Sequence, residues 1–189
     1  MCIVIVISGK SQVFLRRFIC EVADLWDVRL RMSVDLSEVR KRTVAVDQYI
    51  NTLDQPFRQN FLTAKQTYRL NSQATSQLRE FAGKFVIVAF SAGWCKDCTK
   101  NIAVLALINE TAGLEVRVFG GLKRDPLSHV SKWRIPPSPP EVKTFSVDKI
   151  PLIIIFDKEG VEIGRIIENP KQFPTAEEEL LAMIRCRSV

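Results

Sequence analysis

The chain has 189 residues, 47% of them hydrophobic and 25% charged, which suits one folded domain with an extension. Its net charge of +6 lies mostly in the N-terminal part, and its longest basic run is residues 40–42. A solvated helix face explains this pattern better than nucleic-acid binding does. Since no segment reaches the ~18 apolar residues of a membrane span, we expect neither a nucleic acid nor a membrane as partner.

Only one closely spaced pair occurs among the five cysteines, which are Cys2, Cys20, Cys95, Cys98 and Cys186. An odd count with a single pair is unlike a scaffold stapled by disulfides. It is typical of a reducing compartment, where thiols persist. The apolar start at residues 1–8 lacks the basic segment and the cleavage site of a signal peptide. We therefore expect a cytoplasmic protein.

Residues 1–31 form an N-terminal extension whose origin is open. β-branched residues predict a strand over residues 3–7, and apolar residues at helical spacing predict an amphipathic helix over residues 11–31. Met32 then opens a segment that itself reads like the start of a protein. One hypothesis is that the native product begins at Met32 and that residues 1–31 are a mis-called start.

Residues 32–70 are predicted to form a helical extension. Ser33 or Asp35 is a suitable N-cap for a first helix, because the side-chain oxygen of either residue can accept from free amides of the first turn. A break at residues 51–54 separates this helix from a second one. Asp54 is the expected cap of that second helix, and Pro56 falls in its first turn, where proline is tolerated.

The domain predicted over residues 71–189 is organised around a strand-to-helix junction. A short helix over residues 72–81 leads into it. Residues 85–90 are largely β-branched or aromatic and predict a short buried strand. Helix-forming residues with apolar positions at helical spacing follow. Cys95 and Cys98 therefore fall together in the first turn of this helix.

The rest of the chain predicts further strands and helices in alternation. Residues 114–119 alternate apolar and charged side chains, as a half-buried strand does. Asp125 or Pro126 is expected to start a short helix that ends near Trp133. The proline-rich residues 135–140 cannot be regular structure and predict an extended loop.

A hairpin and a last helix complete the predicted order. Strands over residues 152–156 and 161–167 flank a turn at residues 157–160. Thr175 and Glu178 have the spacing of a capping box for the last helix. The strand–helix–strand part implies parallel pairing, and the hairpin adds antiparallel strands. The sequence thus predicts the α/β class.

The Cys95/Cys98 pair is the candidate site. The first helical turn carries free N–H groups and a partial positive charge, which stabilise the nucleophilic thiolate. Residues three apart share one helix face, so the two sulfurs can form a small disulfide. We expect Cys95 to attack first and Cys98 to resolve the mixed disulfide. A structural zinc site needs about four ligands, and since His129 is the sole histidine, we expect no metal.

Two segments carry a resemblance to a known family: Trp94 to Cys98 after the buried strand, and Ile150-Pro151 before the hairpin. The chain resembles the thioredoxin superfamily over roughly residues 70–187. More narrowly it is similar to a branch with Cys-x-Asp-Cys and an N-terminal helical extension. The resemblance implies a three-layer α/β/α sandwich with a mixed central sheet.

The resemblance also implies roles for individual residues. A cis peptide bond is expected before Pro151, with the backbone of Ile150 pairing with an extended substrate segment. Trp94, Lys96 and Asp97 are expected to flank the active site. The positive Lys96 should favour the Cys95 thiolate, and the negative Asp97 should disfavour it.

This chain departs from thioredoxins themselves at two places. Lys96-Asp97 stands where they carry Gly-Pro, and Ala89 occupies the strand position where they carry a buried acid that assists proton transfer from the resolving thiol.

Two functions follow from these observations. The first is a thiol–disulfide oxidoreductase that needs no cofactor beyond its own Cys95–Cys98 disulfide. Its partners would be protein disulfide substrates and a reductase or another dithiol electron donor. The alternative is a non-catalytic interaction module with a thioredoxin fold. The sequence does not fix an oligomeric state for either function.

Overall fold

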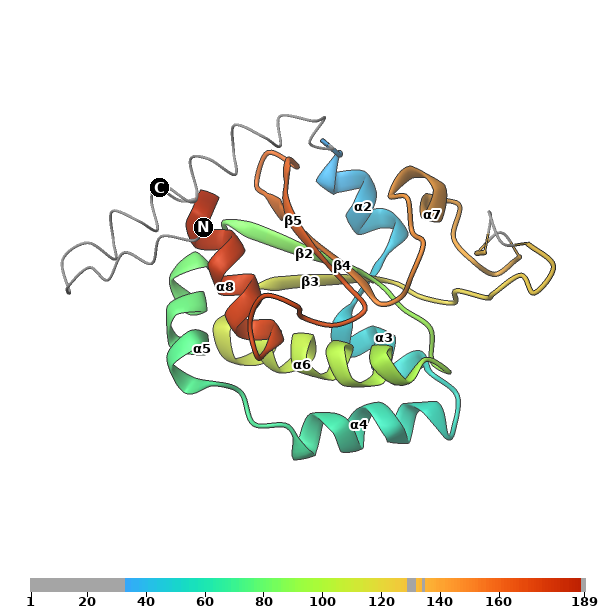
Figure 1. Cartoon of the computed structure of the whole chain (residues 1–189), viewed down its shortest axis with the longest axis horizontal. Coiled ribbons are helices and arrows are strands. Elements are labelled where there is room, and N and C mark those ends of the chain that lie inside the picture. The colour runs from blue at the N-terminus through green and yellow to red at the C-terminus, as the bar shows by residue number, and fades with distance from the viewer. Residues whose placement is uncertain (1–32, 129–131, 134, 188–189) are drawn as a thin grey trace, which may run out of the picture. The chain divides into compact units, whose positions relative to one another are not determined.

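The computed structural model describes residues 33–128, 132–133 and 135–187. The expectations for residues 1–31 and for His129 therefore lie outside the described residues. A five-stranded sheet runs through the described part in the order β1-β3-β2-β4-β5 (Figure 1). Its strands are β1 (Val44–Ala45), β2 (Phe85–Phe90), β3 (Glu115–Phe119), β4 (Leu152–Asp157) and β5 (Glu162–Ile167).

The sheet contains both the parallel pair and the antiparallel hairpin that the order of the chain predicts. β2 lies parallel to β3, whereas β4 pairs antiparallel with both β2 and β5. The sheet is therefore mixed, as expected. β2 and β4 are buried along their whole length, because layers of helix cover both faces of the sheet.

Helices lie on both sides of the sheet. Figure 1 shows α6 and α8 on one side and α2 and α7 on the other, and α3, α4 and α5 all contact α6. This arrangement confirms the three-layer α/β/α fold. No helix of the described ranges is long and apolar enough to cross a membrane. The helices are α2 (Leu36–Arg42), α3 (Val46–Thr52), α4 (Phe57–Thr67), α5 (Ser72–Leu78), η1 (Arg79–Phe81), α6 (Lys96–Ala112), α7 (Glu141–Thr144) and α8 (Ala176–Arg187).

The first predicted helix of the extension is in fact two helices separated by β1. The two residues of β1 pair antiparallel with β3. Arg117 of β3 donates from its guanidinium to the main-chain oxygens of Thr43 and Arg40. These carbonyls lie at the end of α2, where they have no partner within the helix. The break is thus stabilised by a strand that follows much later in the chain.

The helix caps agree with the sequence at two ends and differ at a third. Of the two expected caps, Asp35 is the N-cap of α2 and accepts from the amide of Ser37 at 2.7 Å. Thr175 Oγ1 accepts from the amide of Glu178 at 3.4 Å before α8. The expectation for Asp54 was wrong, because Pro56 is the N-cap of α4 and no side chain caps that helix.

The segment between β3 and β4 differs from the prediction in two places: an expected helix start is a turn, and a short helix occurs where none was expected. Residues 125–128 form a turn rather than the start of a helix, since Asp125 Oδ1 accepts from the amide of Leu127 at 2.9 Å. The rest of the expected helix falls partly outside the described residues. The short helix α7, which begins directly after Pro140, was not predicted.

The start of the extension is docked on the β4–β5 hairpin. The amide of Val34 donates to the main-chain oxygen of Gly160 at 2.9 Å. Gly160 has a φ of +79°, and a Cβ built there would lie 2.0 Å from the main-chain oxygen of Val34. Only glycine allows this close approach of two backbones.

Replacing Gly160 by alanine should therefore cost more stability than the same change at Gly83, which has a similar φ of +74° but nothing within 4 Å of its added Cβ. We expect Gly83→Ala to lower the free energy of unfolding by about 1–2 kcal/mol through backbone strain alone. Gly160→Ala should lose about 1–3 kcal/mol more, because Val34 must move. Urea unfolding of both variants measures the difference. Equal losses would contradict the docking of residues 33–34 on the hairpin.

Candidate active site

Cys95 occupies the N-cap position of α6, directly after the turn that follows β2. Its backbone is extended, and its Sγ accepts from the amide of Cys98 at 3.2 Å. A serine or aspartate oxygen usually makes this bond at a helix start; here a sulfur makes it. The structure thus places both sulfurs in the first turn of α6, where free amides favour a negative charge.

The environments of the two thiols differ sharply. Cys95 is 8% exposed, whereas Cys98 has no exposed surface. Hydrogen bonds from the thiol and the amide of Cys98 lower the pKa of Cys95 to about 7, although burial and the nearby Asp97 oppose them. Burial first, and the hydrogen bond with Cys95 second, raise the pKa of Cys98. Near neutral pH Cys95 is therefore the thiol that ionises readily, whereas Cys98 stays protonated.

The loop before β4 lies against the reactive sulfur. The peptide bond between Ile150 and Pro151 is cis, which is the geometry that the resemblance implies. The Cys95 thiol donates to the main-chain oxygen of Ile150 at 3.8 Å. The oxygen of Pro151 in turn accepts from the amide of Glu168 at 2.8 Å. A backbone acceptor is thus held beside the sulfur.

Lys96 and Asp97 are both exposed. Of the two side chains, that of Asp97 is held by a hydrogen bond. Asp97 Oδ1 accepts from Asn169 Nδ2 at 3.1 Å. The buried Asn101 bridges both partners, because its Nδ2 donates to the main-chain oxygen of Asp97 and to Asn169 Oδ1. The first turn of α6 is therefore fixed to the loop after β5. Hydrogen bonds from Cys98, rather than Lys96, are the main cause of the lowered Cys95 pKa.

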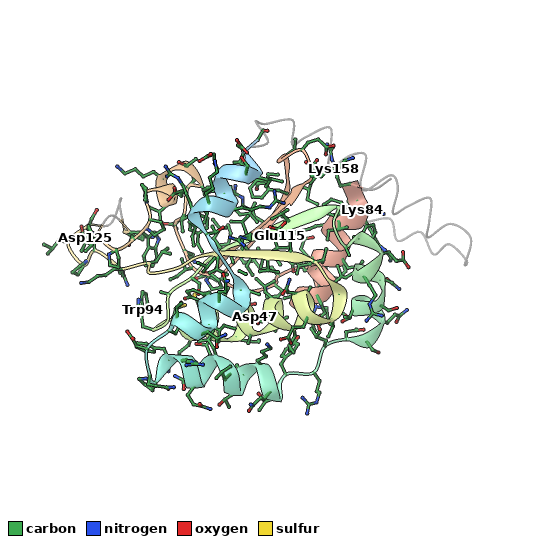
Figure 2. All side chains as sticks on the ribbon, turned by 180° about the vertical axis from the view of Figure 1, so that it is seen from behind. Asp47, Lys84, Trp94, Glu115, Asp125 and Lys158 are labelled. Atoms are coloured by element: carbon green, nitrogen blue, oxygen red, sulfur yellow. The ribbon has the colours of Figure 1, made fainter. Side chains whose placement is uncertain are left out.

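Trp94, which directly precedes Cys95, forms an exposed rim beside it, and Figure 2 labels its side chain. Its side chain is 49% exposed, and its Nε1 donates to the main-chain oxygen of Leu122 at 3.1 Å. Its ring stacks on that of Trp133, with the centroids 6.3 Å apart. Trp133 is buried and donates to the main-chain oxygen of Asp148. The rim is therefore a fixed aromatic surface rather than a loose side chain.

Two further residues near the sulfurs, Tyr49 and Ser91, were not predicted from the sequence. Tyr49 of α3 donates from its hydroxyl to Ser91 Oγ at 3.0 Å, and the side chain of Ser91 lowers the pKa of the Cys98 thiol, against the larger effect of burial. In the sequence Tyr49 occupies a position in the apolar stripe of a helix, so the pattern does not indicate that its hydroxyl makes a polar contact. The only signal in the sequence is a serine that directly follows the buried strand before the cysteines.

The described ranges contain no cluster of three or more histidine, cysteine or acidic side chains that could hold a metal ion. Cys95 and Cys98 are both free thiols. Two sulfurs alone fall short of the about four ligands of a structural zinc site. The arrangement is suited instead to reversible formation of a disulfide.

A dithiol at the start of a helix after a buried strand, beside a cis-proline loop, defines the thioredoxin class of fold. The profile of the thioredoxin family matches residues 43–180, and the chain belongs to this family. No curated protein matches the sequence.

Solved structures of the same fold share little sequence with this chain. A protein of unknown function from Pseudomonas aeruginosa is 18% identical, with a TM-score of 0.61 over 80% of this chain and 98% of that one. An HIV epitope-scaffold is 15% identical, with a TM-score of 0.61 and the same two shares covered. At these identities the likeness shows the fold alone.

The negative charge of Asp97 should hold the pKa of Cys95 above the value that the helix start alone would give. Asp97→Asn should therefore lower this pKa below about 7, because a like charge near a thiolate disfavours it. The new amide oxygen can still accept from Asn169. The measurement is the pH dependence of alkylation by iodoacetamide, followed by mass spectrometry of the peptide that carries Cys95.

Asp148→Asn is the matched control for this charge removal. Asp148 is exposed and paired with Lys132, and its loss should leave the pKa of Cys95 unchanged. A Cys95 pKa that stays constant or rises in Asp97→Asn would contradict the electrostatic account.

Proposed function

We propose that the protein is a thiol–disulfide oxidoreductase that acts on protein disulfides through the Cys95/Cys98 couple. The observation that carries this proposal is the first turn of α6. There the Cys95 sulfur accepts from the Cys98 amide, and its pKa is lowered to about 7 while that of Cys98 is raised. Cys95 is thus the thiol that can attack, and Cys98 stays protonated until the second step.

The reaction divides into two exchanges between sulfurs. The Cys95 thiolate attacks one sulfur of a substrate disulfide, which forms a mixed disulfide and expels the other substrate sulfur as a thiolate. Cys98 then attacks the Cys95 sulfur and releases the second substrate thiol. The substrate gains two electrons, and Cys95 and Cys98 end as a disulfide. A reductase or another dithiol donor of the reducing cytoplasm would restore the two thiols.

An extended polypeptide is the substrate that the surroundings of the sulfur favour. The main-chain oxygen of Ile150 is directed at Cys95 and could pair with a substrate amide beside the sulfur. Pro151 follows in a cis peptide, and the fixed ring of Trp94 lies next to Cys95 in the chain. These groups recognise backbone and apolar surface rather than a particular side chain.

One observation also favours the alternative of a non-catalytic interaction module. Apolar rings are exposed around the turn before α6: Trp94 is 49% and Phe57 36% exposed, and Phe57 lies 3.4 Å from a Cβ built on Gly93. Such a rim could bind a partner without chemistry. In that function both cysteines would be dispensable.

Substituting the resolving thiol tests the two functions against each other. Cys98→Ser should accumulate mixed disulfides with protein substrates, because nothing removes the substrate bound to Cys95. Non-reducing electrophoresis and mass spectrometry of the linked peptides measure these adducts. Wild type should catalyse insulin reduction by dithiothreitol, and Cys98→Ser should lose most of this activity.

Cys95→Ser is the matched control, since it keeps Cys98 and removes only the attacking sulfur. It should form no adduct through the active site. If Cys98→Ser formed no adducts under oxidising load and wild type did not accelerate insulin reduction, the oxidoreductase would be excluded in favour of the interaction module.

A further inference from the structure

In the second step of the proposed reaction, attack by Cys98, a negative charge must form on a buried sulfur. Cys98 has no exposed surface, and burial raises the pKa of its thiol. The thiolate is the attacking form, so resolution requires a charge to develop on a buried sulfur. Ala89, which has no exposed surface either, stands where the family resemblance would place a buried acid. Its methyl group can neither accept the proton nor stabilise the charge.

Two buried hydroxyl groups lie where that stabilisation is needed. Ser91 has no exposed surface and Tyr49 is 3% exposed. The side chain of Ser91 lowers the pKa of the Cys98 thiol and so favours the thiolate, and its Oγ accepts from the hydroxyl of Tyr49 at 3.0 Å. The two hydroxyl groups thus connect α3 with the surroundings of the resolving sulfur.

Tight packing holds the tyrosine in this position. A Cβ built on Gly120 would lie 2.6 Å from Tyr49 Cε2, so the ring lies against bare backbone after β3. Phe61 of α4 contacts the same ring edge-on, with centroids 6.0 Å apart. The hydroxyl of Tyr49 therefore has little freedom to leave Ser91.

We propose that Ser91 is a catalytic residue that stabilises the Cys98 thiolate during resolution, and that Tyr49 is a positioning residue that orients the Ser91 hydroxyl towards the sulfur. This inference rests on the proposed function and assigns the group that replaces the missing buried acid. It also gives the helical extension a part in the chemistry, because Tyr49 lies on α3.

The orientation follows from the number of hydrogens in the two hydroxyl groups. A serine hydroxyl has one hydrogen and two acceptor sites. Since the Tyr49 hydroxyl fills one acceptor site, the hydrogen of Ser91 is free to be directed at Cys98. Burial raises the pKa of Tyr49, so its phenol stays protonated and remains the donor. Hydrogen bonds in such a chain strengthen one another at low dielectric.

The step balances without any further reactant. The S–H bond of Cys98 breaks, a bond forms between Cys98 and Cys95 sulfurs, and the bond between Cys95 and the substrate sulfur breaks. The electron pair leaves with the substrate sulfur, which takes up the proton that Cys98 has lost. Ser91 and Tyr49 keep their own protons throughout and supply only hydrogen bonds.

The two sulfur exchanges can be timed separately with dithionitrobenzoate. The full chain is used, with Cys2, Cys20 and Cys186 replaced by serine so that only the active-site pair reacts. Attack by Cys95 releases a first thionitrobenzoate, and resolution by Cys98 releases a second. Stopped-flow absorbance should resolve two phases in the wild-type pair.

Ser91→Ala should slow the second phase by about ten- to a hundredfold, the range expected for a hydrogen bond to a charged group. Tyr49→Phe keeps the ring and should slow the same phase by about tenfold or less, since it acts through Ser91. The first phase should stay within about twofold in both variants, which also reports that they are folded. The pH profile of the second phase should move to higher pH, because the thiolate forms less readily.

Tyr68→Phe is the matched control. Tyr68 is the second of the two tyrosines, lies in the same extension and donates its hydroxyl to Glu177. Removing it should alter neither phase. Second phases in Ser91→Ala and Tyr49→Phe that matched wild type in rate and pH profile would overturn the inference while leaving the oxidoreductase intact. A wild-type pair without a first phase would instead overturn the proposed function.

Discussion

The hydrogen bond from the Cys98 amide to the Cys95 sulfur is the interaction on which the site depends. It makes the sulfur the cap of α6, so the same contact that begins the helix also stabilises a negative charge on Cys95. The contact requires a fixed helix start. The fully buried strand β2 leads into that start, and the cis-proline loop contacts the Cys95 sulfur through the main-chain oxygen of Ile150. Helix capping and thiol activation are therefore one property of this junction.

The same turn of helix gives its two cysteines opposite properties. The outer sulfur accepts hydrogen bonds from the thiol and the amide of Cys98, so its pKa falls. The inner sulfur lies against the core, where the cost of charging a group without water is greatest. In the proposed reaction, attack by Cys95 is thereby favoured at the expense of resolution by Cys98. This asymmetry explains why the groups around Cys98, rather than those around Cys95, should decide how fast a bound substrate leaves.

The sequence was informative wherever a structure depends on neighbours in the chain. The strand before the dithiol, the helix after it, the β4–β5 hairpin and the Thr175 cap all follow from local periodicity and turn residues. The failures depend on distant partners. Val44 and Ala45 look helical by spacing, yet they pair with β3, and Arg117 binds the carbonyls that end α2. Asp125 closes a turn on itself instead of starting a helix.

The residues of the site also divide into those that local sequence predicts and those that it does not. Cys95, Cys98 and Pro151 could be predicted because their motifs are short and their family is recognisable. Tyr49 and Asn169 could not be predicted, because each comes from a part of the chain far from the cysteines. Each also contributes only a polar side-chain group, and tyrosine and asparagine occur in many other structural roles. An extension that seemed separable in sequence thus contributes a buried hydroxyl next to the dithiol. Removing α3 would do more than shorten the protein, since it would expose Gly120 and Ser91 and put water where the hydroxyl of Tyr49 now lies.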